Sequence, residues 1–399
     1  MHYDFETVID RAGTGACKWE HMFADNPNVA KGIIPLSVAD MELKNAPEIQ
    51  EGLKRYIDNS VLGYSNPTDA YLDAVIGFMK RHHDWDVKKE WIYQTPGVVS
   101  ALFFAVKAYT DPGDGVIIMT PVYYPFYGAV TANGRVVVEN PLIEDGDSYR
   151  IDFEDLERKT KDPKNKLILL CSPHNPVGRV WTREELERIG RICIDNDVLI
   201  VSDEIHFDLI MPGYHHTVFS TISEEFNQHC VVCTAPSKTF NLAGMQTSNI
   251  MIANEEIRKK FIDQVESCGM YIANILGYEA CRIAYTDCDA WLKELLEVIV
   301  RNKEYIEQFV ARHLPQVKVK RLEGTYLLWL DFRAYGLSAK ELEHFMKMDA
   351  QLFFDDGYMF GQSSEGFERI NMACPTWVIE QAMDRLLAAM KEKFPKTVQ

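Results

Sequence analysis

The sequence lacks the features that would direct it to a membrane or to nucleic acid. No uninterrupted apolar run approaches the ~18 residues that a membrane-spanning helix needs. Basic residues are in deficit, with 42 Lys+Arg against 59 Asp+Glu and a formal net charge of −17, which argues against a polyanion-binding surface. The polar N-terminal stretch MHYDFETVID has no apolar signal segment. We therefore expect a cytoplasmic protein that binds neither membranes nor nucleic acid.

The sequence also lacks the pattern of a disulfide framework or of a metal site. Its nine cysteines are odd in number and scattered, which favours a reducing compartment. Cys230 and Cys233 have redox-motif spacing, but they fall in an apolar run in which residues three apart would face opposite sides of a strand. The histidine doublets at 82–83 and 215–216 have no partners at ligand spacing, so we expect surface histidines and no metal.

Short apolar runs alternate with helix-like segments between about residues 95 and 255, which is typical of stacked βα units. Several runs are apolar throughout, as expected for strands that helices cover on both faces. Thr182 and Glu185 form a capping-box pattern that predicts a crossover helix. The pattern predicts an α/β fold with a mostly parallel sheet between helices, built from GVIIMT, RVVVEN, KLILLC, DVLIVS, HCVVCT and SNIMIA.

The pattern changes from about residue 277 onward. A long amphipathic stretch, DAWLKELLEVIVRNKEYIEQFVARHL, predicts a helix, and VKVKRL and TYLLWLDF then predict strands. We therefore predict three parts: an N-terminal segment at 1–47 that packs on the small domain, a large domain at 48–285 and a smaller α+β domain at 286–399.

Polar side chains follow three of the predicted parallel strands. Asn175 follows KLILLC, Asp203 and then His206 follow DVLIVS, and Lys238 follows HCVVCT. Each has a simple structural interpretation, as a turn, a helix cap or a solvated loop residue. In an open parallel sheet, however, ligands bind at the carboxyl ends of the strands, so we expect these groups to converge.

Two further features fall at the same predicted edge. Gly97 opens an apolar helix whose N-terminus would offer unpaired backbone N–H groups to a phosphate, although the TPG signal is weak alone. Tyr123 follows GVIIMT, where its ring could stack on a flat ligand or simply pack in the core.

An anion cradle, an aromatic ring, a carboxylate, an amide and a lysine together fit pyridoxal 5'-phosphate. In this interpretation Lys238 binds the cofactor aldehyde covalently and Asp203 keeps the pyridine nitrogen protonated, so that the ring accepts electrons. Asn175 and His206 would lie beside the 3'-oxygen of the ring.

The chain resembles fold-type-I pyridoxal-phosphate enzymes, and most closely the bacterial cystathionine β-lyase or carbon–sulfur lyase branch of the class I/II aminotransferase-like proteins. The motifs FETVIDRAGTGACKWE, VADMELKNAPEI, LGYSNP, TPGVVSAL, SPHNPVG, SDEIHFDL, SKTFNLAG, GTYLLWLDF and GFERINMACP carry the resemblance almost from end to end. One departure from the aspartate-type aminotransferases is Gln246, which stands where those enzymes place a phosphate-binding arginine, and this agrees with the lyase-like branch.

The resemblance implies roles for individual residues. Lys238, Asp203 and Tyr123 would be catalytic, and Arg369 would bind the substrate α-carboxylate through a bidentate fork, with Asn175 and Ala39 beside it. Tyr64 would reach the site of the partner subunit in a homodimer. The remaining cofactor contacts would come from Gly97, Val98, Val99, Asn175, His206 and Ser237.

We expect the enzyme to cleave cystathionine or a related S-substituted cysteine to a thiol, pyruvate and ammonia. Transamination of an amino acid substrate uses the same cofactor and the same proton abstraction, so a class I/II aminotransferase is the alternative. An added regulatory role, in which the surface contacts another protein, is a weaker possibility because no tail or motif identifies such a surface.

Overall fold

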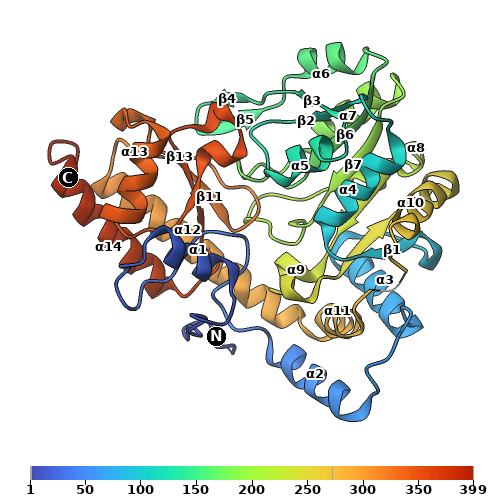
Figure 1. Ribbon diagram of the computed structural model, residues 1–399, viewed down its shortest axis with the longest axis horizontal. Coiled ribbons are helices and arrows are strands. Elements are labelled where there is room, and N and C mark those ends of the chain that lie inside the picture. The colour runs from blue at the N-terminus through green and yellow to red at the C-terminus, as the bar shows by residue number, and fades with distance from the viewer. Residues whose placement is uncertain (1, 272, 399) are drawn as a thin grey trace.

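The computed structural model describes residues 2–271 and 273–398, and it contains two main sheets surrounded by helices (Figure 1). The larger sheet has seven strands in the order β1-β9-β8-β7-β6-β2-β3. Four neighbouring pairs are parallel, and only the pairs that involve β9 are antiparallel. These strands are β1 (Ile92–Thr95), β2 (Gly115–Ile118), β3 (Val136–Glu139), β6 (Asn165–Cys171), β7 (Leu199–Asp203), β8 (Cys230–Thr234) and β9 (Ser248–Met251).

Helices cover both faces of this sheet, because alternate residues of each central strand enter different apolar clusters. In β6, Leu167 and Leu169 pack with α4 (Val98–Tyr109), α5 (Pro125–Thr131) and α10 (Glu255–Ser267). Ile168 and Leu170 lie in the other cluster, which includes α3, α6, α7 and α11. The mostly parallel sheet between helices is confirmed. The helices of the second face are α3 (Asp69–His83), α6 (Phe153–Thr160), α7 (Arg183–Ile194) and α11 (Ile275–Asp287).

The second sheet has four strands in the order β10-β11-β13-β12. Its antiparallel strands are β10 (Lys318–Val319), β11 (Leu327–Asp331), β12 (Asp355–Asp356) and β13 (Phe367–Asn371). The predicted long helix is α12 (Asp289–His313), which packs against α14 (Thr376–Lys393), and α13 spans Ala339–His344. A two-stranded sheet joins β4 (Ile143–Asp145) and β5 (Ser148–Arg150), and α8 and α9 are short helices at Glu224–Asn227 and Pro236–Thr239.

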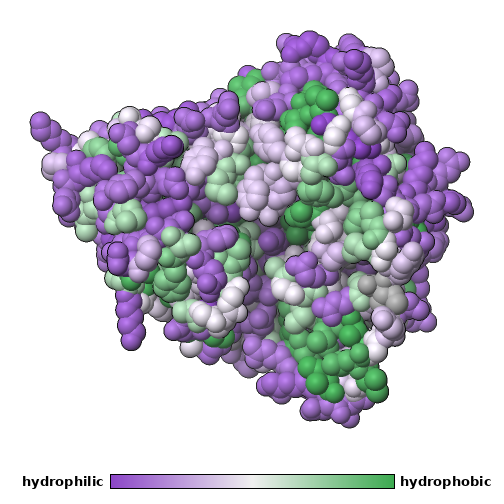
Figure 2. Space-filling model, viewed as in Figure 1, coloured by the Kyte–Doolittle hydropathy of each residue, from purple (hydrophilic) through white to green (hydrophobic). Residues whose placement is uncertain are grey.

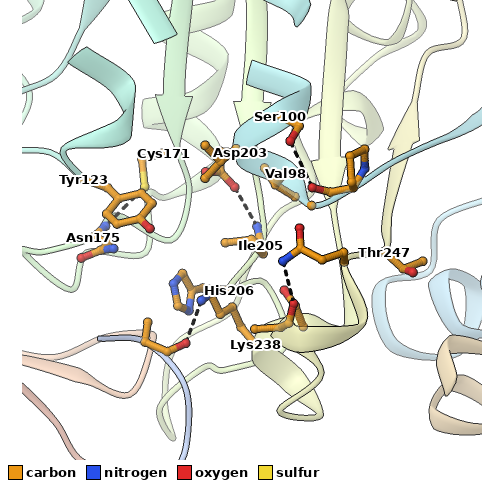
Figure 3. A pocket seen from close by; sticks show the side chains of 17 residues that line it. Val98, Ser100, Tyr123, Cys171, Asn175, Asp203, Ile205, His206, Lys238 and Thr247 are labelled. Atoms are coloured by element: carbon orange, nitrogen blue, oxygen red, sulfur yellow. Dashed lines mark hydrogen bonds between the residues drawn. The ribbon is translucent and has the colours of Figure 1, made fainter. Parts of the chain in front are cut away.

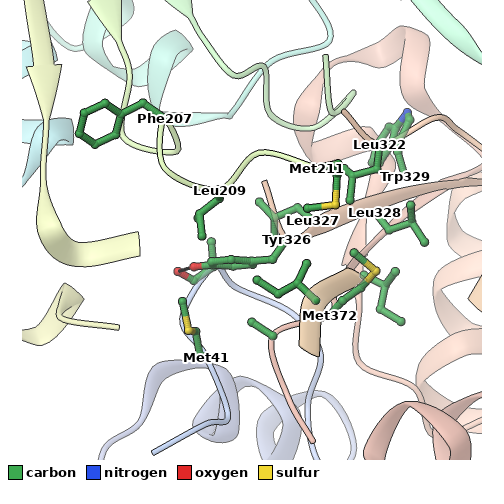
Figure 4. Packing of buried hydrophobic residues seen from close by; sticks show 14 of the residues in the cluster. Met41, Phe207, Leu209, Met211, Leu322, Tyr326, Leu327, Leu328, Trp329 and Met372 are labelled. Atoms are coloured by element: carbon green, nitrogen blue, oxygen red, sulfur yellow. Dashed lines mark hydrogen bonds between the residues drawn. The ribbon is translucent and has the colours of Figure 1, made fainter. Parts of the chain in front are cut away.

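The N-terminal segment, with α1 (Cys17–Asp25), lies beside the second sheet and precedes α2 (Pro47–Asn59) (Figure 1). Backbone bonds hold it there: Leu36 N donates to Phe353 O over 2.9 Å, and Glu42 N donates to Ala373 O over 2.9 Å. Figure 4 shows Met41 packed near Tyr326, in the apolar cluster that the segment shares with both sheets. The domain boundaries at 47 and 285 stay predictions.

Two local predictions are confirmed. Thr182 and Glu185 form a complete capping box at the start of α7. Cys230 and Cys233 enter the two different apolar clusters and so face opposite sides of β8. Among the described residues, no helix combines the length and apolar character that crossing a membrane requires.

Candidate active site

The carboxyl ends of β6, β7 and β8 meet at one cavity of about 340 Å³ (Figure 3). Cys171 and Asp203, the last residues of two neighbouring strands, pair in register, and Asn175 follows four residues after Cys171. Lys238 lies in the short helix α9 directly after β8. Asn175, Asp203, His206 and Lys238 all line the cavity, so the convergence expected from a parallel sheet is present.

Lys238 is a buried amine. Its Nζ donates to Ala39 O over 2.7 Å, and Tyr326 donates its hydroxyl to the same carbonyl over 2.9 Å. Burial lowers the pKa of Lys238 to about 8, against an opposing attraction from Asp40. The amine therefore loses its proton more readily near neutral pH than an ordinary lysine does, which suits a lysine that acts as a nucleophile or base.

Asp203 has a buried carboxyl group, and few hydrogen bonds nearby offset the cost of burying its negative charge. It accepts one hydrogen bond, from Ile205 N over 3.2 Å. Burial raises the pKa of Asp203 to about 7, although the hydrogen bond from Ile205 and the charge of Lys238 both oppose the rise. A protonated ring nitrogen placed next to this carboxyl would supply the missing positive partner.

His206 and Tyr123 supply neutral rings. His206 is 3% exposed, its Nδ1 makes no hydrogen bond with any described residue, and burial lowers its pKa well below the usual value. Burial also raises the pKa of Tyr123, so its phenol stays protonated. Tyr123 N donates to Asn175 O over 3.1 Å, which ties the aromatic residue to the end of β6.

The N-terminus of α4 forms another wall of the cavity through Gly97, Val98, Val99 and Ser100. Gly97 precedes the helix with φ 86°, a conformation that favours glycine. No described side chain caps this 12-residue helix, since Ser100 donates its hydroxyl to Pro96 O instead. The first N–H groups of α4 and the side chain of Ser237 are therefore available at the cavity as hydrogen-bond donors to an anion.

Arg369 lies just behind the cavity wall. Its NH1 donates to Asn175 Oδ1 over 2.8 Å, while its Nε and NH2 donate to Asp355. Asp355 and Arg369 are directly opposed on β12 and β13, which places both side chains on one face. Asp355 could not be identified as the partner of Arg369 from the sequence, because the register of the two strands is needed to find it.

Tyr64 does not reach the cavity of its own chain. Its side chain is 98% exposed, next to Tyr271 on the surface. All the other predicted site residues except Arg369 line the cavity, which also includes the unpredicted residues Pro96, Ser100, Cys171, Ile205, Ala243 and Thr247.

The expectation of surface histidines is wrong for one member of each doublet. His83 Nε2 lies 2.7 Å from Asp208, which also accepts a hydrogen bond from Thr239, the neighbour of Lys238. His216 Nε2 lies 2.7 Å from Glu204, the neighbour of Asp203. Both histidines therefore support elements that carry site residues, while His82 and His215 are exposed.

The cavity groups fit pyridoxal 5'-phosphate: an amine, a carboxyl that lacks a cation, an unpartnered imidazole nitrogen, an aromatic ring and an uncapped helix N-terminus. Among residues 2–271 and 273–398, no cluster of His, Cys, Asp or Glu has the arrangement of a metal site.

Comparison with known proteins agrees with this chemistry. The family model for aminotransferase class I and II matches residues 31–386. Cystathionine beta-lyase PatB of Bacillus subtilis is 41% identical over 97% of this chain and 100% of its own length. The crystal structure of cystalysin from Treponema denticola, which contains pyridoxal 5'-phosphate, covers 98% of this chain and 100% of that one, with 49% identity and a TM-score of 0.97.

The PLP-bound C-S lyase of Staphylococcus hominis is also similar, with 30% identity, a TM-score of 0.90 and coverage of 98% of each chain. These matches extend over nearly the whole sequence. The chain therefore belongs to the aminotransferase class I and II family.

Proposed function

We propose that the protein is a pyridoxal-phosphate-dependent carbon–sulfur β-lyase, which converts an S-substituted cysteine and water to a thiol, pyruvate and ammonium. The observation that carries this proposal is the buried amine of Lys238, with its pKa near 8, in the same cavity as Asp203. The relatives named as lyases, at up to 41% identity, favour elimination over transamination.

The cavity residues would hold the cofactor through complementary groups. Lys238 would bind its aldehyde, Asp203 its pyridine nitrogen, and Asn175 with His206 the 3'-oxygen, while Tyr123 would cover the ring. The phosphate would lie at Gly97, Val98, Val99 and Ser237. When bound, the cofactor withdraws electrons from the substrate Cα and so makes its proton removable.

The other residues would bind the substrate and move its protons. Arg369 would hold the α-carboxylate, helped by Asn175 and the Ala39 backbone. Lys238 would take the proton from Cα and then give a proton to the sulfur as the C–S bond breaks. Its lowered pKa supports both steps, because a base must be deprotonated and an acid protonated near the working pH.

We also propose a homodimer in which Tyr64 enters the partner's site. Figure 2 shows an apolar patch in its lower part, where Figure 1 draws α2 and α11. Apolar side chains exposed in this part of the chain include Val61 at 89% and Leu62 at 58%, beside the fully exposed Tyr64. Burial of such a patch would favour association. The nine free cysteines support a reducing, cytoplasmic location.

The test of the lyase function is product analysis with S-ethyl-L-cysteine. We expect ethanethiol, pyruvate and ammonium in equal amounts, and borohydride reduction should place a pyridoxyl adduct on Lys238. Release of a thiol without pyruvate, or an adduct on another lysine, would contradict the proposal.

Shared sites are tested by mixing refolded Tyr64→Phe and Lys238→Ala subunits. In a mixed dimer with shared sites, one site carries both changes and the other carries neither. We therefore expect more activity from the mixture than from either parent. Activity no higher than that of the parents would exclude the donation of Tyr64 across the interface.

A further inference from the structure

A second cavity of about 300 Å³ adjoins the active site, and we call it the N-terminal cavity. The residues that matter here are Arg11, Asp40, Glu42, Lys44 and Ala243. Ala243 lines both cavities. Asp40 follows Ala39, whose carbonyl accepts the hydrogen bond from Lys238 Nζ. The first charged residue of the N-terminal cavity, Asp40, is therefore the sequence neighbour of the residue that contacts Lys238.

The wall of the N-terminal cavity carries both signs of charge. Arg11 NH2 donates to Asp40 over 2.8 Å and its NH1 donates to Glu42 over 2.9 Å. Lys18 Nζ lies 3.0 Å from Asp40 and 3.3 Å from Glu42. Burial alone would raise the pKa of Asp40, but Lys18 and Arg11 hold it below the usual value, so the carboxylate stays charged.

This charge network has hydrogen-bonding groups that its own contacts do not use. A guanidinium carries five N–H donors, and Arg11 uses two of its own in hydrogen bonds to described residues, Asp40 and Glu42. The Arg11 side chain is 28% exposed and that of Asp40 is 20% exposed. Glu42 is 4% exposed, and its Oε2 accepts no hydrogen bond from any described residue. A buried acceptor without a donor favours a ligand that brings one.

The balance of charges indicates which ligand fits. Two cations and two anions, Arg11, Lys18, Asp40 and Glu42, give the network no net charge, so an ion of a single sign meets no net attraction. An amino acid group is different, because its carboxylate can contact Arg11 and Lys44 while its ammonium contacts the carboxylates.

We propose that the N-terminal cavity is a leaving-group subsite that binds the zwitterionic end of a thioether amino acid, such as the distal end of cystathionine. This inference rests on the proposed lyase function. A network that only fixed the N-terminal segment would affect all substrates alike. A subsite affects them according to the charge of the group on sulfur.

Four substrates separate these cases: L-cystathionine, S-(2-carboxyethyl)-L-cysteine, S-(2-aminoethyl)-L-cysteine and uncharged S-ethyl-L-cysteine. The quantity measured is kcat/KM for each charged substrate divided by kcat/KM for S-ethyl-L-cysteine in the same enzyme. This ratio cancels any general effect of a variant on folding or on the chemical step.

Arg11→Gln and Lys44→Gln should each lower the ratio for the carboxyethyl substrate, by about tenfold for Arg11, without lowering it for the aminoethyl substrate. Asp40→Asn should lower the ratio for the aminoethyl substrate instead. Lys54→Gln is the control, because Lys54 pairs with Glu51 on the surface of α2, outside this cavity.

Unchanged ratios in the Arg11 and Lys44 variants would overturn the subsite. If Arg11→Gln does not fold, Lys44→Gln decides the question, since the ion-pair partner of Lys44 among the described residues is the exposed Asp4. Cleavage of S-ethyl-L-cysteine shows independently whether the lyase function holds. If none of the four substrates is cleaved, the proposed function and the subsite are both overturned.

Discussion

The strand ends of the large sheet and the β12–β13 pair of the small sheet hold their charged groups in opposite ways. Lys238 and Asp203 are buried with one hydrogen bond each, and their pKa values move to about 8 and about 7. Arg369 is 1% exposed, but Asp355 and Asn175 accept hydrogen bonds from three of its nitrogens. Few partners leave a group reactive, whereas many partners fix its orientation for binding.

The largest effect is expected from removing the reactive amine. Lys238→Ala should lower kcat for S-ethyl-L-cysteine by about 10³-fold or more, since it removes both the base and the acid. Steady-state pyruvate release measures this, with Lys89→Ala, a surface lysine paired with Asp69, as the control. A loss of less than tenfold would remove Lys238 from the proton transfers.

A smaller effect is expected from changing Arg369, whose guanidinium is held by several hydrogen bonds. Arg369→Lys replaces a planar fork with a point charge. The transition-state stabilisation calculated from kcat/KM should therefore fall by about 2–4 kcal/mol, while the cofactor remains bound. Substrate saturation and cofactor absorbance are the two readouts. Arg333→Lys, on the exposed side of the same domain, is the matched control. Unchanged saturation by substrate would exclude Arg369 from carboxylate binding.

The smallest effect is expected on the free energy of unfolding, and it tests directly whether Lys238 is buried with too few partners for its charge. The folded-state pKa of Lys238 is lowered from 10.5, so the unfolded chain binds more protons between pH 8 and 10.5. Burial of the charged amine therefore costs stability below pH 8, and the cost disappears as pH rises toward 10.5.

Lys238→Met should thus stabilise the cofactor-free protein at pH 7 by about 1–3 kcal/mol, and the gain should shrink by pH 9.5. Urea unfolding of the wild type and the variant at both pH values measures this. The surface substitution Lys54→Met should show neither the gain nor its pH dependence. A Lys238→Met protein that is less stable than the wild type at pH 7 would contradict the assigned pKa shift.

The convergence of Asn175, Asp203 and Lys238 on one cavity can be predicted from the sequence, because parallel strands impose that geometry. Asn175, Asp203 and Lys238 each follow an apolar run, and neighbouring parallel strands bring such positions to one edge. The order of the strands along the chain is enough to predict this convergence. The same reasoning predicted the helices on both faces of the sheet from the uniformly apolar strands.

The rest of the site depends on contacts between distant segments. Asp355 meets Arg369 only through the antiparallel register of β12 and β13. His83 ends α3 and meets Asp208 from far along the chain, so its polar neighbours in the sequence suggested a surface position that is wrong. The carbonyl of Ala39 likewise reaches Lys238 because the N-terminal segment folds back over the cavity.

The most direct test of the central claim counts turnovers in the absence of any keto acid. With an S-substituted cysteine as sole substrate, elimination returns the enzyme to its starting state each cycle, so we predict many equivalents of pyruvate per subunit. Transamination would stop after about one equivalent, because no acceptor removes the nitrogen from the cofactor. A single-turnover burst that resumes only when 2-oxoglutarate or pyruvate is added would contradict the lyase and establish an aminotransferase.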